Sequence, residues 1–161
     1  GGSKMRKLII VFVTISLTLF CGCAVRTQDV TSGRELGKEV LRCFDEEDVD
    51  GLKSLFCEEI QNTHNLYEDI KNAMDIYQGK TISYKIIGGT GGETVENGKI
   101  VLKDENIQIG EIKTDTGNEY VIVIYSYVIN EEYPNRIGIS AIDIFMGYEL
   151  EADKITVGKV L

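Results

Sequence analysis

The sequence predicts an α+β fold in which three N-terminal helices pack on one face of a curved antiparallel sheet. Apolar residues recur every three or four positions as far as Tyr77, which is the period of an amphipathic helix. From Lys80 onward the period is close to two, which is typical of strands. Helices followed by a run of strands favour the α+β class. A curved sheet that wraps over a long helix forms a cone, and a cone offers an interior pocket.

Each helix is predicted from its own apolar stripe. The stripes consist of Leu36, Val40, Leu41 and Phe44; of Leu52, Leu55 and Phe56; and of Leu66, Tyr67, Ile70, Ala73, Met74 and Tyr77. Asp48 or Asp50 is suited to cap the second helix, because a carboxylate accepts a free backbone N–H there. Gly79 follows the third helix as its C-terminal stop.

The strands are predicted from Thr81 to the end of the chain. In the first, Ile82, Tyr84 and Ile86 alternate with polar residues, so we expect these three to share one face. Segment 119–130 is apolar on both faces, which predicts a central strand covered on both sides. Further strands are expected at 100–103, 107–114 and 137–145, with a polar strand or tail at 149–161. Tight turns are expected at 96–99 and 115–118, and a flexible glycine-rich connection at 88–92.

The chain is strongly acidic. Its 161 residues include 17 Lys and Arg against 26 Asp and Glu, so the formal charge is −9. Non-specific nucleic-acid binding depends on clustered Lys and Arg, so the composition argues against a nucleic-acid partner. The length suits one folded unit with a short appendage, and a hydrophobic content of 43% is typical of globular proteins.

The N-terminal residues are interpreted as an export leader. Residues 1–4 precede a plausible start at Met5 and are excluded as a cloning remnant. Arg6 and Lys7 come next, followed by an apolar stretch at 8–20. This stretch is too short to cross a hydrocarbon core, which takes about 20 helical residues. Its length is that of the apolar region of a signal peptide, so we assign residues 5–22 to one.

The end of the leader resembles the lipobox of bacterial lipoproteins, in which an apolar residue and two small residues precede a lipidated cysteine. Here these positions hold Phe20, Cys21, Gly22 and Cys23. The resemblance implies cleavage before Cys23 and a diacylglycerol thioether on its sulfur, which anchors the chain to the membrane. Residues 23–33 then form a lipidated tether and residues 34–161 the folded domain. Ordinary secretion and an uncleaved tethering helix are the alternatives.

Residues 34–145 resemble the nuclear transport factor 2-like superfamily, also called cystatin-like. The resemblance rests on the three helices, on Asp48 and Leu52 at the start of the second, and on the strands at 119–130 and 137–145. The chain is also similar to an uncharacterised-domain family of lipoproteins from Gram-positive gut bacteria. The similar segments are 53–56, 71–74, 114–117 and 130–139. The resemblance implies a fold and an extracytoplasmic location, and none of these segments is catalytic.

Enzymes of the superfamily place an acid or base and a tyrosine inside the cone, which makes Asp143 the best catalytic candidate. It interrupts an apolar strand, and burial raises the pKa of a carboxyl group toward general-base use. Tyr67, Tyr125 or Tyr127 is then suited to donate to an oxyanion in an isomerase- or hydratase-like reaction. The alternative is that Asp143 points outward and the tyrosines fill the core. We expect the alternative, and therefore no enzyme.

Cys43 and Cys57 are the cysteines that remain in the folded domain. An exported chain permits a disulfide between them, and two buried thiols are the alternative. His64 is the only histidine and has no Cys-x-x-Cys beside it, so no zinc site and no cofactor are expected. The acidic residues of segment 45–50 lack the glycine and the closing glutamate of a calcium loop, and we expect them to cap a helix.

These observations favour a lipid-anchored binding protein on the extracytoplasmic face of the cell membrane of a Gram-positive bacterium. The expected partners are the membrane, through Cys23, and an unidentified protein or small molecule. Self-association as a homodimer stays open. A small-molecule enzyme that uses Asp143, and a purely structural spacer of the envelope, are the other two hypotheses.

Overall fold

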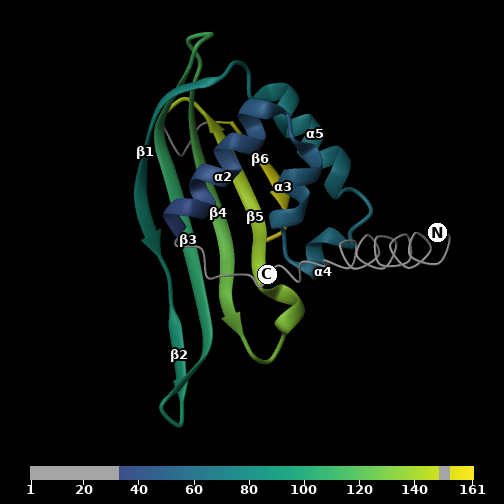
Figure 1. Ribbon diagram of the computed structural model, residues 1–161, viewed down its shortest axis with the longest axis vertical. Helices are drawn as coiled ribbons and strands as arrows, with labels where there is room; N and C mark the ends of the chain where they lie inside the picture. The colour runs from purple at the N-terminus through teal and green to yellow at the C-terminus, as the bar shows by residue number, and fades with distance from the viewer. Residues whose placement is uncertain (1–32, 149–152) are drawn as a thin grey trace, which may run out of the picture.

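The structure, a computed structural model, describes residues 33–148 and 153–161. Helices occupy the first part of this region and strands the second, so the predicted α+β class is confirmed. Figure 1 shows the helices gathered on one side of a long, curved sheet. The predicted leader, the tether as far as residue 32 and Cys23 lie outside the described residues.

Four helices precede the sheet in the described part of the chain. They are α2 (Gly33–Glu46), α3 (Val49–Leu55), α4 (Glu58–Gln61) and α5 (Leu66–Ile76). α2, α3 and α5 are the predicted helices, whereas α4 is a single turn too short to show a period. Asp48 caps α3 as predicted, because its Oδ1 accepts a hydrogen bond from the Gly51 N–H at 2.8 Å. No helix within 33–148 or 153–161 has the length and hydropathy needed to cross a membrane.

Six antiparallel strands form one sheet. They are β1 (Thr81–Thr90), β2 (Glu93–Glu96), β3 (Lys99–Thr114), β4 (Glu119–Asn130), β5 (Gly138–Met146) and β6 (Lys154–Gly158). The strand order is β1-β3-β4-β5-β6, and β2 also pairs with β3. A short 3-10 helix, η1 (Pro134–Arg136), joins β4 to β5. β4 has its predicted bounds, whereas the segments predicted at 100–103 and 107–114 belong to the single long strand β3.

The β2–β3 hairpin turns at Asn97 and Gly98, as the sequence predicts. Both residues have positive φ, at 50° and 80°, which is the backbone of a type I′ turn. The hairpin extends well beyond the helices in Figure 1. The glycine-rich segment predicted as a flexible connection is partly strand, because residues 88–90 end β1 and pair with β3.

The inner face of the sheet, which faces the helices, carries the hydrophobic core. Ile122 of β4 lies opposite Ile144 of β5, and Ile124 lies opposite Ile142. All four are at most 1% exposed, and they form one cluster with Ile70 of α5 and other helix residues. Side chains of both layers therefore meet in the space where an interior cone pocket was expected.

The outer face of the sheet points away from the helices, and no helix of the described part covers it. β4 is nonetheless the central strand that the sequence predicts, because it pairs with β3 on one side and with β5 on the other. Val121 and Phe145 lie opposite each other on this face, 3% and 6% exposed, outside the core cluster. Lys154 extends over Phe145, with its Nζ 5.9 Å from the centre of the ring. Long side chains of the sheet itself contribute to burial here.

The edge strand β1 departs most from its predicted pattern. Ile82 is 67% exposed and Tyr84 is 43% exposed, whereas Ile86 packs against the core. The pairing of β1 with β3 shifts register at three places. Each shift inserts an unpaired residue and breaks the alternation of faces. The prediction of one shared apolar face for Ile82, Tyr84 and Ile86 is therefore wrong.

Candidate functional site

Asp143 lies in β5 on the outer face of the sheet. Its neighbours Ile142 and Ile144 both belong to the core cluster, so the alternation of the strand directs Asp143 away from the helices. It is nonetheless only 3% exposed. The residue is therefore buried but lies on the opposite side of the sheet from the expected interior cavity.

The Asp143 carboxylate is held by three neighbours, and we call the four residues the Asp143 cluster. Lys154 Nζ donates to Oδ2 at 2.9 Å, and Thr156 Oγ1 donates to Oδ1 at 2.6 Å. The Tyr125 hydroxyl donates to Oδ2 at 3.4 Å. Hydrogen bonding to Asp143 raises the pKa of Lys154, whereas burial, followed by the charge of Asp143, raises the pKa of Tyr125. The Lys154 ammonium and the Tyr125 phenol are therefore both protonated at neutral pH.

The other two tyrosine candidates lie elsewhere. Tyr127 donates its hydroxyl hydrogen bond to the backbone oxygen of Leu161 at 2.7 Å. Tyr67 is on α5 and is 46% exposed. The structure thus brings Tyr125 to Asp143, but it does not gather Tyr67, Tyr127 and Asp143 into one site.

Cys43 and Cys57 are both buried and both free. Burial raises the pKa of Cys43 to about 11 and also raises the pKa of Cys57. Of the two alternatives for this pair, the structure therefore contains the buried thiols. Within residues 33–148 and 153–161, no group of three or more His, Cys, Asp or Glu side chains is arranged to hold a metal ion.

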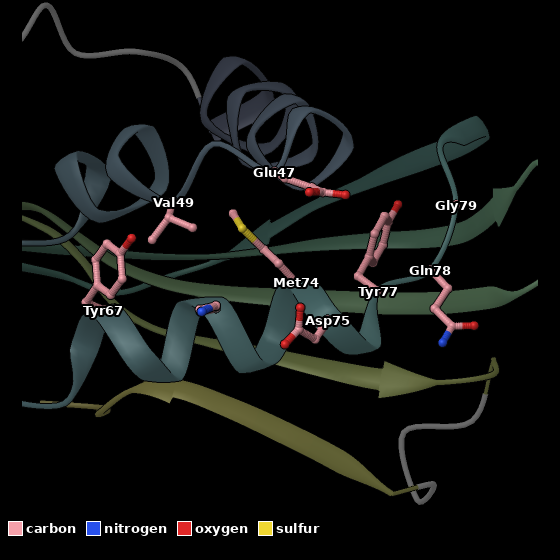
Figure 2. A pocket seen from close by; sticks show the side chains of 9 residues that line it. Glu47, Val49, Tyr67, Met74, Asp75, Tyr77, Gln78 and Gly79 are labelled. Atoms are coloured by element: carbon pink, nitrogen blue, oxygen red, sulfur yellow. The ribbon is translucent and has the colours of Figure 1, made fainter.

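A pocket lies between α5 and the turn that joins α2 to α3, and we call it the α5 pocket. Its volume is about 420 Å³, within the usual range of sites for small organic ligands. Figure 2 shows Glu47 and Val49 on one side and Tyr67, Met74 and Tyr77 on the other. The full lining is Glu47, Val49, Tyr67, Lys71, Met74, Asp75, Tyr77, Gln78 and Gly79. A second, more open hollow of about 550 Å³ shares Asp75 and Gln78 with it.

The floor of the α5 pocket is buried and mostly apolar. Met74 is 7% exposed and Tyr77 is 4% exposed. The Tyr77 ring stacks on Tyr120 at 4.7 Å between ring centres and meets Phe44 at 5.0 Å. Its hydroxyl hydrogen-bonds the Thr81 hydroxyl at 2.6 Å. Burial raises the pKa of Tyr77 to about 12, so the floor is uncharged at neutral pH.

The rim of the α5 pocket carries three charged side chains. Glu47, Lys71 and Asp75 line the pocket, yet they take part in none of the ion pairs within the described part of the chain. Glu47 has a φ of 54°, a backbone conformation that favours glycine. This conformation ends α2, because the backbone N–H groups of Glu47 and Asp48 turn back to bond the carbonyl oxygens of Phe44 and Cys43.

Sequence reasoning identified only one residue of this pocket, Tyr67, as a site candidate. Met74 and Tyr77 were predicted as core residues, and they do form the floor. Glu47 was considered only as part of the acidic segment 45–50, which was expected to cap a helix, and Asp75 was missed, because their approach depends on how the α2–α3 turn packs on α5. The available signal was the run of acidic residues after Phe44, in a position where a helix usually ends with glycine.

Comparison with known families gives one match. The family model described as “Domain of unknown function (DUF5104)” matches residues 39–150, which is more than half of the chain. The expected similarity to an uncharacterised-domain family is confirmed at that level. No curated protein matches the chain. The matched segment includes every residue of the α5 pocket.

Proposed function

The chain belongs to the family of the domain of unknown function DUF5104, and we propose a function for it. The proposal combines the predicted leader with the α5 pocket. In this proposal the chain is a lipid-anchored binding protein on the extracytoplasmic face of a Gram-positive cell membrane. Its domain holds a small ligand in the α5 pocket and performs no catalysis. The observation that carries the binding function is a pocket with an apolar floor and with rim charges that form no ion pair among residues 33–148 and 153–161.

The anchor is supported by the sequence of residues 5–23. A basic start, a short apolar stretch and a cysteine after Gly22 are the features of a lipoprotein leader. Two acyl chains give stable attachment, because each buried methylene contributes about 0.8 kcal/mol. The acidic domain would be repelled by anionic lipid, so the attachment depends on the lipid rather than on a basic surface.

We also propose that the fold is of the nuclear transport factor 2-like type. Support comes from the helices that precede the sheet and from their packing on a single face of six antiparallel strands. In this proposal the cone interior is filled by the core, and the ligand site lies at the rim between α5 and the α2–α3 turn.

The enzyme hypothesis has one supporting observation, which is the contact between Tyr125 and Asp143. A general base needs a lone pair that is free to accept a substrate proton. Lys154 and Thr156 already donate to both oxygens of Asp143. We therefore propose binding rather than proton transfer.

The anchor is tested by metabolic labelling with radioactive palmitate in a Gram-positive host. The full chain should incorporate label into the membrane fraction, and Cys23→Ala should abolish the incorporation. Cys21→Ala is the matched control and should keep it. Equal labelling of the Cys23→Ala variant would remove the anchor from the proposal.

The pocket is tested with methyl-labelled methionine, because the chain has only three methionines. Met74 lies on the pocket floor, Met146 is 41% exposed on β5, and Met5 belongs to the leader. A small ligand in the α5 pocket should shift the Met74 methyl resonance, which Met74→Leu assigns, and leave that of Met146 in place. If no cationic, neutral or anionic small molecule moves the Met74 resonance, the pocket is not a binding site.

A further inference from the structure

We infer that the α5 pocket takes a small organic cation whose charged group is an alkylated ammonium. This inference rests on the proposed binding function and adds the chemical class of the ligand. It depends on the charges at the rim, on the two helix ends that meet there, and on the shape and chemistry of the floor.

The charges at the rim favour a positive ligand. Glu47 comes from the α2–α3 turn and Asp75 from α5, so the two carboxylates approach the pocket from opposite walls. Lys71 is the one basic residue of the lining, which leaves one net negative charge. Arg42, on the last two turns of α2, does not compensate, because it is bonded to Glu39, Glu46 and Asp48.

Two helix ends add negative potential to the same space. α2 ends at Glu46, directly before Glu47, and α5 ends at Ile76, directly after Asp75. The C-terminal end of a helix carries a partial negative charge because its peptide dipoles are aligned. Neither helix has a basic residue in its last turn to offset it. A bound cation would supply the missing positive charge at both ends.

The floor and wall select an organic cation over a hydrated metal ion. Val49 and Met74 present methyl and thioether groups, which pack against alkyl substituents and offer nothing to a shell of water. Tyr67 is 46% exposed, so its ring is open to a cation, whereas the ring of Tyr77 is engaged by Phe44 and Tyr120. An aromatic face attracts an ammonium group, and best when its charge is spread over alkyl carbons.

The test compares ligands of one shape and different charge. Choline and 3,3-dimethyl-1-butanol differ in one atom, a cationic nitrogen in place of a neutral carbon, and 3,3-dimethylbutyrate adds a matched anion. The full chain, solubilised in an uncharged maltoside detergent, is titrated with each while the Met74 methyl resonance is followed. Choline should bind with a dissociation constant of about 1–10 mM, and the neutral and anionic analogues at least about fivefold more weakly.

Variants assign the effect to the rim. Glu47→Gln and Asp75→Asn should each weaken choline binding about threefold or more and leave binding of the neutral alcohol unchanged. Glu111→Gln is the matched control, because Glu111 also has a positive φ, of 53°, but lies in β3 away from the pocket. It should leave choline binding unchanged.

The outcomes separate the two proposals. If the alcohol or the butyrate shifts Met74 as tightly as choline does, or if Glu111→Gln weakens choline as much as Glu47→Gln, the cation class is wrong while the pocket remains a binding site. The three ligands are also tested at 100 times the expected dissociation constant, which is about 0.1–1 M. If none of them shifts the Met74 methyl resonance there, both the ligand class and the binding function are wrong.

Discussion

The α5 pocket and the Asp143 cluster both place carboxylate, ammonium and phenol groups close together, but they differ in how these groups are satisfied. Asp143 accepts from Lys154, Thr156 and Tyr125 and is 3% exposed. Glu47 and Asp75 line an open hollow and have no ion-pair partner in the described part of the chain. A charge that is fully bonded within the fold stabilises it, whereas a charge left open at a pocket is available to a ligand.

The comparison corrects an intuition taken from the sequence alone. A lone acid in an apolar strand suggests a catalytic residue. In the structure, however, neighbouring strands of the same sheet donate hydrogen bonds to both of its carboxylate oxygens. The acids of the pocket are unremarkable in sequence, because they belong to a polar helix face and to a turn. Satisfaction of hydrogen bonds, which only the fold determines, separates the two cases.

The largest expected effect is a difference in the free energy of unfolding between variants of the two acids. Asp143→Ala removes a buried acceptor and should lower the free energy of unfolding by about 1–3 kcal/mol. Asp75→Ala, its matched counterpart in the pocket, should change it by less than about 0.5 kcal/mol, because this residue is exposed and unpaired. Urea unfolding of both variants at pH 7 measures the difference. Equal losses would mean that the pocket acid is also structural.

Alkaline pH should act on the floor of the pocket. The pKa of Tyr77 is raised from 10.0 to about 12, and that of Cys43 from 9.0 to about 11, mainly by burial. Because both groups are neutral when protonated, their contribution to stability is complete below pH 9 and is lost as the pH rises from 9 to 12. The free energy of unfolding should fall over this window, as urea titrations at each pH would measure.

Tyr77→Phe isolates the contribution of the floor. It should flatten the fall between pH 10 and 12, whereas Tyr67→Phe, at the exposed wall of the same pocket, should leave the fall as it is. An unchanged fall in the Tyr77→Phe variant would show that the floor does not depend on a neutral phenol.

The smallest expected effect is a gain. Glu47→Gly relieves a positive φ and should raise the free energy of unfolding by about 0.5–1 kcal/mol. Glu111→Gly should give a gain of similar size, because Glu111 has nearly the same φ. Thermal unfolding of both variants measures the gains. Of the two, only Glu47→Gly should also weaken choline binding, and a loss of stability on Glu47→Gly would mean that the glutamate is kept for the fold.

Local patterns predicted most of the fold. The stripes that end at Tyr77 gave three helices near their observed positions, and the run from 119 to 130 gave β4 with its observed bounds. The prediction for β1 was wrong, because bulges in its pairing with β3 break the alternation of its side chains between the two faces of the sheet. Ile82 and Tyr84 are therefore exposed. Register is a property of two strands together, and neither strand alone encodes it.

The site was less predictable, for two physical reasons. The orientation of Asp143 depends on which residues of β5 face the helices. Residues 141–145 are all buried, so the sequence of β5 shows no alternation between a buried and an exposed face. The pocket depends on the packing of α5 beside the α2–α3 turn, which brings Asp75 to Glu47 across 28 positions of sequence. Tyr67 was singled out for proximity to Asp143 and instead lines this pocket.

The irregular edge of the sheet has a consequence for how two molecules of this chain meet. A strand at the border of a sheet carries unpaired backbone groups, and a strand of another molecule can pair with them. β1 is such a border, and it exposes two isoleucines, Ile82 and Ile87. Its three breaks in spacing deprive a neighbouring molecule of a continuous backbone template. The bulges that break the alternation of β1 therefore also make edge-to-edge pairing with a second molecule less favourable.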